Sequence, residues 1–164
     1  YYDARPRNAA GLIEAAYMVA VIHARKGRRN EAEEWYKKVI FQQRTLSKPD
    51  APVGASFAAE SKYILVSKTF DELRAIKIPA DPSRQARAVQ EKLQKLERLK
   101  EQLKDVIKYD DGPMIVNSLA LIGQAYQHMA AAIYAVPVPK GLDAEGLKQY
   151  RAGVDKIAQP FQDE

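Results

Sequence analysis

Five short segments rich in glycine, proline and aspartate constrain the fold of this chain more than any other feature. They lie at residues 27–30, 47–52, 78–83, 109–113 and 136–141. Such residues interrupt helices, because glycine adopts left-handed backbone easily and proline lacks an amide donor. Between the breaks, apolar residues recur at spacings of three and four, the period of one helix face. The sequence therefore predicts six helices and no strands.

The first two predicted helices, 8–26 and 31–46, meet at a tight turn. Gly27 is expected to end the first helix, because glycine adopts the left-handed cap conformation at little cost. Asn30, followed three residues later by Glu33, predicts a capping box at the start of the second helix. The two helices should form an antiparallel pair.

The central segments, 54–77 and 82–109, predict a long helical hairpin. The second of them carries Val89, Leu96 and Leu103 at intervals of seven residues, which is the repeat of a coiled coil. Lysines interrupt this apolar seam at positions 92 and 100. An antiparallel hairpin is therefore favoured over a free coiled coil, with oligomerisation through the long helix as the alternative.

The last pair begins after an Asp-Asp-Gly-Pro turn. Residues 113–135 are strongly apolar, and we expect them to form the most buried helix. Asp143 is a candidate N-cap for a final helix that continues to residue 161. Asp110 and Asp111 are the only adjacent carboxylates in a turn, and a helix corner explains them better than a calcium site, which needs about twelve residues of alternating ligands.

Two segments carry the spacing of a known helical repeat. The first consists of Ala16, Val19, Ala20, His23, Gly27, Ala32, Tyr36 and Val39. The second consists of Leu119, Ile122, Gly123 and Tyr126 and, after an insertion of eleven residues, Gly146, Tyr150, Gly153 and Ala158. The chain thus resembles tetratricopeptide-repeat proteins, which pair two helices in about 34 residues. It departs from their pattern at Arg44, where the closing proline is expected, and at Leu119, where tryptophan is expected.

The resemblance covers about 90 of the 164 residues. It implies a single α-solenoid domain over residues 1–164, with a first pair at 8–46, the long hairpin at 53–109 and an interrupted pair at 113–162. It also implies that the chain is the C-terminal part of a longer repeat protein. The C-terminal segment looks like helical-repeat proteins of deltaproteobacteria, some of which belong to the cell envelope or the gliding machinery. A periplasmic or cell-envelope location is therefore favoured over the cytoplasm.

In repeats of this kind the first helices line a concave surface. Residues that do not pack between helices then face a groove, which suits an extended peptide. In the first copy these candidates are Glu14, Tyr17, Val21, Ala24 and Arg25. In the second copy they are Asn117, Ala120, Gln124, Gln127 and His128. The alternative is that neighbouring helices of a longer protein cover them.

The sequence lacks the motifs of common enzymes. It contains no P-loop, no G-x-S-x-G and no G-x-G-x-x-G. The absence of cysteine removes disulfides and thiol catalysis. His23 and His128, the only histidines, do not have the spacing of metal ligands. We therefore predict a protein with no catalytic residues, metal or cofactor, which acts as a scaffold for a protein or peptide partner.

The charge distribution leaves one alternative function. The net charge is +5, and a basic cluster at residues 25–29 could meet nucleic acid or an anionic surface. Acidic residues follow it at once, at positions 31, 33 and 34, so a solvated rim between helices is favoured over a nucleic-acid site. No apolar run reaches the roughly 18 residues of a membrane span.

Overall fold

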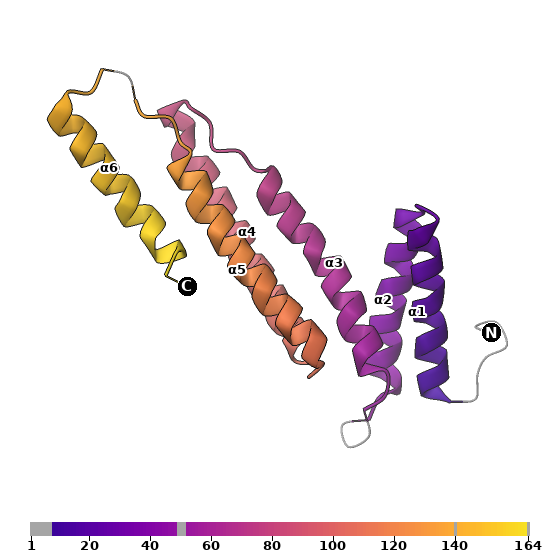
Figure 1. Ribbon diagram of the computed structural model, residues 1–164. Helices are drawn as coiled ribbons and strands as arrows, with labels where there is room; N and C mark the ends of the chain where they lie inside the picture. The colour runs from indigo at the N-terminus through magenta and orange to yellow at the C-terminus, as the bar shows by residue number, and fades with distance from the viewer. Residues whose placement is uncertain (1–7, 49–51, 140, 164) are drawn as a thin grey trace. The chain divides into compact units, whose positions relative to one another are not determined.

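The computed structural model describes residues 8–48, 52–139 and 141–163. Within these ranges it contains six α-helices, a short 3₁₀ helix and no β-strand (Figure 1). The elements are α1 (Ala9–Arg25), α2 (Arg29–Leu46), α3 (Ala55–Ala75), α4 (Pro82–Ile107), α5 (Gly112–Tyr134), α6 (Ala144–Ala158) and η1 (Gln159–Phe161). The predicted all-α class is thereby confirmed for the described part of the chain. The central residues 49–51 of the predicted loop at 47–52 lie outside it, as do residues 1–7, 140 and 164.

The helices divide into two compact units. The first comprises the described residues up to Lys68 together with Gln102–Ser118, and the second comprises Thr69–Glu101 and the described residues from Leu119 onward. Three helices, α3, α4 and α5, therefore each begin in one unit and end in the other. The prediction of a single domain over residues 1–164 stays a prediction.

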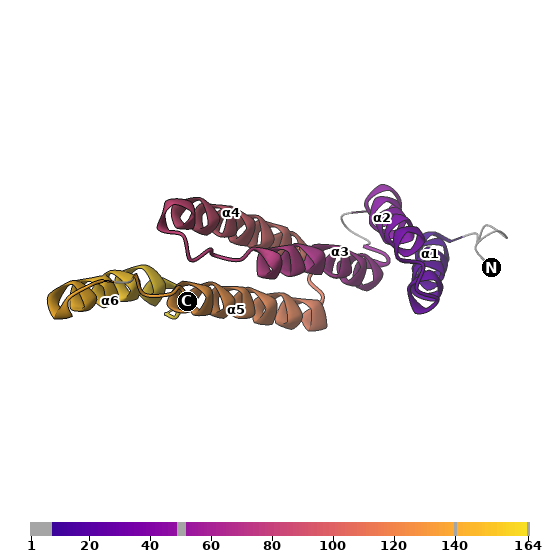
Figure 2. The same cartoon turned by 90° about the horizontal axis from the view of Figure 1, so that it is seen from above.

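In the first unit, α1 and α2 lie side by side and run antiparallel, as Figures 1 and 2 both show. Asn8 caps α1, because its side chain accepts a hydrogen bond of 2.6 Å from the amide of Gly11. Gly27 ends the helix with a φ of +73°, as the sequence predicts. Small buried residues such as Ala16 and Ala20 face the neighbouring helix and allow close packing.

The predicted capping box at the start of α2 is wrong. The helix begins at Arg29, and its cap residue, Arg28, makes no side-chain cap hydrogen bond. Asn30 consequently lies inside the first turn. The Glu33 carboxylate pairs with Lys68 of α3 and with a lysine one turn later on α2, so it is not directed back to the helix start.

The core of the first unit consists of two small clusters. They contain Ile13, Ala16 and Val39, and Ala20, Ala32 and Tyr36. The first half of α3 packs on them through Phe57, Ile64 and Leu65. The fully buried positions on this half of α3 are nevertheless the small ones, Ala58, Ala59 and Ser61.

The predicted antiparallel hairpin of α3 and α4 stays a prediction, and an ion pair joins the two helices in each unit. In the first unit Lys62 lies 3.7 Å from Asp105, and in the second unit Lys95 lies 2.7 Å from Glu72. The apolar seam of α4 is buried inside the chain at Leu96, Leu99, Leu103 and Val106. Oligomerisation through the long helix stays a prediction.

The Asp-Asp-Gly-Pro corner is a turn, as predicted. Asp110 adopts a φ of +55°, and the Asp111 carboxylate accepts a hydrogen bond of 3.1 Å from the amide of Met114. The expectation that the following helix is the most buried one holds for only one side of it. Val116 and Leu119 of α5 are 65% and 56% exposed.

The last helix packs on α5 within the second unit. Asp143 caps α6 by accepting a hydrogen bond of 2.8 Å from the amide of Gly146, as predicted. Ala158 at the end of α6 is fully buried. The rings of Phe161 and Tyr126 lie 6.3 Å apart between their centroids, and this contact holds η1 against α5.

Candidate functional site

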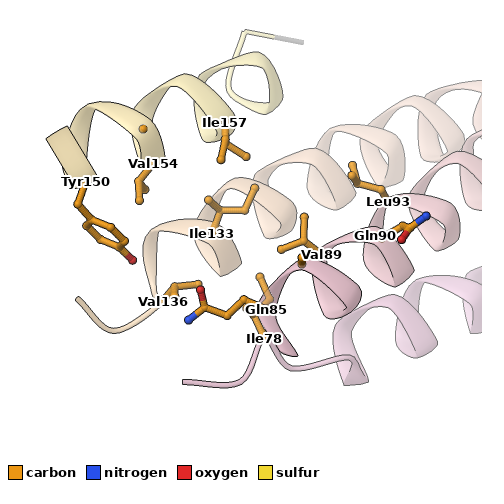
Figure 3. A pocket seen from close by; sticks show the side chains of 12 residues that line it. Ile78, Gln85, Val89, Gln90, Leu93, Ile133, Val136, Tyr150, Val154 and Ile157 are labelled. Atoms are coloured by element: carbon orange, nitrogen blue, oxygen red, sulfur yellow. The ribbon is translucent and has the colours of Figure 1, made fainter. Parts of the chain in front are cut away.

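An apolar groove lies in the second unit, where α4, α5 and α6 come together (Figure 3). Its cavity volume is about 570 Å³, which falls within the roughly 300–1,000 Å³ range of typical binding pockets. The lining consists of Ile78, Gln85, Ala86, Val89, Gln90, Leu93, Ile133, Val136, Tyr150, Gly153, Val154 and Ile157.

The groove follows from helical spacing. On α6, Tyr150, Val154 and Ile157 are four and three residues apart, so they share one face and point into the groove (Figure 3). Val89 and Leu93 form a matching pair on α4. Gly153 carries no side chain, and a Cβ added there would meet no atom within 4 Å.

The groove carries no charged side chain among its lining residues. Its polar groups are the amides of Gln85 and Gln90 and the hydroxyl of Tyr150. Outside the groove lining, Val138 and Leu142 between α5 and α6 are 47% and 42% exposed. Large exposed apolar patches are rare on isolated soluble domains and are typical of interaction surfaces.

A buried cluster of titratable groups lies elsewhere in the second unit. Lys92 is fully buried, and its ammonium donates hydrogen bonds of 2.8 Å to the carbonyl oxygens of Leu73 and Ile76. The Lys92 nitrogen also lies 3.1 Å from Nε2 of His128. The His128 ring meets the Phe70 ring edge-on. Burial lowers the pKa of Lys92, and burial together with the charge of Lys92 lowers the pKa of His128.

This cluster is a helix cap and not an open site. The last carbonyls of a helix have no partner within it, and cations near the C-terminus satisfy them. Lys92 does this for α3, whose final residues include Leu73. Because Lys92 is completely shielded from solvent, a substrate could not reach its amine.

The candidates of the first copy share one face of α1 but differ in exposure. Glu14 and Arg25 are exposed on α1, and Val21 is half-buried. Tyr17 is half-buried, and its ring packs 5.1 Å from that of Phe57 and against the buried clusters of the first unit. That it faces a groove stays a prediction. Burial and a hydrogen bond to a glutamate of α3 raise the pKa of Tyr17.

Four of the five candidates of the second copy are exposed. Asn117, Gln124 and Gln127 are exposed on α5, as is Ala120. His128 is the exception, because it packs against the α3 and α4 residues described above. Asn117 belongs to the first unit, whereas Ala120, Gln124, Gln127 and His128 belong to the second.

The apolar groove was not predicted from the sequence. Val89 was expected in the seam between α3 and α4, and on α6 the repeat pattern includes Tyr150 and Gly153 but neither Val154 nor Ile157. The spacing of Tyr150, Val154 and Ile157 is the signal that could have revealed a second apolar face. Whether neighbouring helices cover such a face is decided by the packed structure.

Neither a protein-family model, nor a curated protein, nor a solved structure matches the chain. Within the described ranges, no group of three histidine, cysteine, aspartate or glutamate side chains is placed to hold a metal ion. None of the described helices combines the length and hydropathy needed to cross a membrane.

Proposed function

We propose that the chain is a non-enzymatic scaffold that binds a protein partner, and that an amphipathic helix of the partner lies in the groove of α4, α5 and α6. The observation that carries this proposal is an apolar groove of about 570 Å³ whose lining has no charge. The core of protein interfaces is depleted of charged residues and rich in aromatic and apolar ones. An uncharged apolar helix face complements such a lining in both polarity and charge.

A helix fits the groove better than a small polar substrate does. Small-molecule sites orient their ligands with several convergent polar groups. Here Gln85, Gln90 and Tyr150 are the polar side chains of the lining. Grooves between helices bind a partner helix through apolar anchors at i, i+3, i+4 and i+7.

A tetratricopeptide-like solenoid in a cell-envelope complex belongs to the same proposal. The burial of Ala16, Ala20, Ala32 and Tyr36 supports the repeat pattern in the first pair, because the pattern requires packed residues at these positions. In the second pair the pattern has less support, because Leu119 is 56% exposed.

The test uses a fluorescent synthetic peptide helix with leucines at i, i+3, i+4 and i+7 and uncharged residues elsewhere. Gly153→Leu places a side chain in the groove from α6, where its Cβ meets no atom within 4 Å, and we expect it to weaken binding by about tenfold, or 1.4 kcal/mol. Fluorescence anisotropy measures the affinity. A peptide with serines in place of the leucines should not bind.

Gly123→Leu is the matched control. Gly123 is also helical, and a Cβ there also meets nothing within 4 Å, but it lies on α5 outside the groove. We expect its affinity to equal that of the unmodified chain. If Gly123→Leu blocks the peptide and Gly153→Leu does not, the exposed face of α5 is the binding surface and the groove is not.

A further inference from the structure

The net charge of the chain is concentrated in one segment. Residues 23–48 contain eight basic and three acidic residues, which gives +5. The rest of the chain contains 18 basic and 18 acidic residues and is neutral. The whole excess of positive charge therefore lies on the corner between α1 and α2 and along α2, in the first unit.

On α2, the cations surround an exposed aromatic ring. Phe41 is 66% exposed, the largest value among the exposed large apolar residues of the described chain. Lys37 and Lys38 precede Phe41 by four and three residues, and Arg44 follows it by three. The three cations therefore lie on the same helix face as Phe41, and all three are exposed. Glu34 lies at one end of this face and pairs with Lys37 at 2.9 Å.

We propose that this face of α2 docks on an anionic lipid surface. Phe41 enters the boundary between headgroups and acyl chains, while Lys37, Lys38 and Arg44 contact lipid phosphates and carboxylates. Helices that bind in the plane of a membrane combine apolar side chains with a border of lysine and arginine in this way. Juxtamembrane cations each add to the attraction of an anionic leaflet.

The contacts of Trp35 favour lipid over single-stranded nucleic acid. Proteins that bind single strands stack bases on open aromatic faces. The Trp35 ring has the Lys38 ammonium 4.3 Å from its centroid and packs against both buried clusters of the first unit. Phe41 is thus left as the exposed ring of this face, which suits insertion between lipids better than a row of stacked bases.

The experiment is co-sedimentation of the full chain with phosphatidylcholine vesicles that contain or lack phosphatidylserine. We expect binding to the anionic vesicles alone, and it should weaken as salt is raised. Phe41→Ser should lower the partition coefficient by about tenfold, because it removes the inserted apolar group. The double variant Lys38→Gln with Arg44→Gln should lower it by about tenfold as well.

Two controls match these changes on exposed positions elsewhere. Leu119→Ser removes a comparably exposed apolar group, and Lys148→Gln with Arg151→Gln removes the same charge from α6. Both should bind like the unmodified chain. Equal loss in the control pair would overturn the proposal, as would binding of a random single-stranded oligonucleotide without binding of anionic vesicles. Removal of the opposing charge by Glu34→Gln should strengthen vesicle binding.

Discussion

Lys92 shows how the role of a residue depends on its partners. In the sequence it interrupts the apolar seam of the longest helix. In the structure its ammonium is fully buried and bound to the carbonyl oxygens of Leu73 and Ile76. A buried ammonium is tolerated only when hydrogen bonds replace its lost hydration. The interruption of the seam is therefore a tertiary cap on α3.

Removing this cap should destabilise the fold. Lys92→Met keeps an unbranched side chain but leaves two carbonyl oxygens without this donor, and we expect a loss of about 1–3 kcal/mol. Chemical denaturation measures the change. Lys95→Met is the control, because its partly exposed ion pair with Glu72 should be worth about 1 kcal/mol or less. A Lys92→Met chain more stable than the unmodified one would mean that burial of the charge costs more than its bonds contribute.

His128 should make the stability depend on pH. Its pKa in the folded chain is lowered below the usual 6.5 by burial, by Lys92 of α4 and by Arg74 of α3. The unfolded chain therefore takes up the proton first, so the stability is fully present above about pH 6.5 and is lost as the pH falls through the folded pKa. Between about pH 7 and pH 5, the free energy of unfolding should fall more steeply for the unmodified chain than for His128→Gln. Equal slopes would contradict this role.

At the scale of elements, the helix corners depend on glycine for two different reasons. Gly27 and Gly54 both have positive φ, at +73° and +66°. A Cβ at Gly27 would meet no atom within 4 Å, whereas at Gly54 it would lie 2.7 Å from Cγ2 of Ile13. The second corner therefore combines a backbone requirement with close packing of the start of α3 against α1.

Alanine substitutions separate these two reasons. Gly27→Ala should cost about 1–2 kcal/mol, because it brings only the strain of the left-handed backbone. Gly54→Ala should cost about 1–3 kcal/mol more, because it also forces Ile13 out of its place. Thermal denaturation of both variants measures the difference. Equal costs would show that Ile13 moves aside without penalty.

At the scale of the whole molecule, the two compact units share three continuous helices. No glycine or proline lies within three residues of the boundaries after Lys68, Glu101 and Ser118. Breaking a helix at such a point would leave backbone groups without partners. We therefore expect the units to unfold together.

Core variants in each unit test this coupling. Val39→Ala in the first unit should cost about 1–3 kcal/mol, and Met129→Ala in the second about 2–5 kcal/mol, because both side chains are fully buried. Each variant should lower the midpoint of one common transition, followed by circular dichroism and by Trp35 fluorescence. Separate transitions for the two probes would show that the units are independent.

The sequence by itself determined the six helices and most of their ends. These features follow from local periodicity, from glycine and proline breaks and from side-chain caps such as Asp111 and Asp143. The capping box at Asn30 failed because Glu33 binds a lysine of a distant helix. Tertiary contacts override local preference in this way.

Only the tertiary structure decided which apolar faces are covered. From the sequence, Tyr17 and His128 were expected to face a groove. In the structure, Tyr17 packs against a buried cluster and His128 lies next to Lys92 of α4. Val154 and Ile157 lie outside the repeat pattern and line the apolar groove, with Ile157 55% exposed. Periodicity identifies an apolar face because it depends on one helix alone. Whether that face becomes core or binding surface depends on the positions of neighbouring helices, which no local pattern specifies.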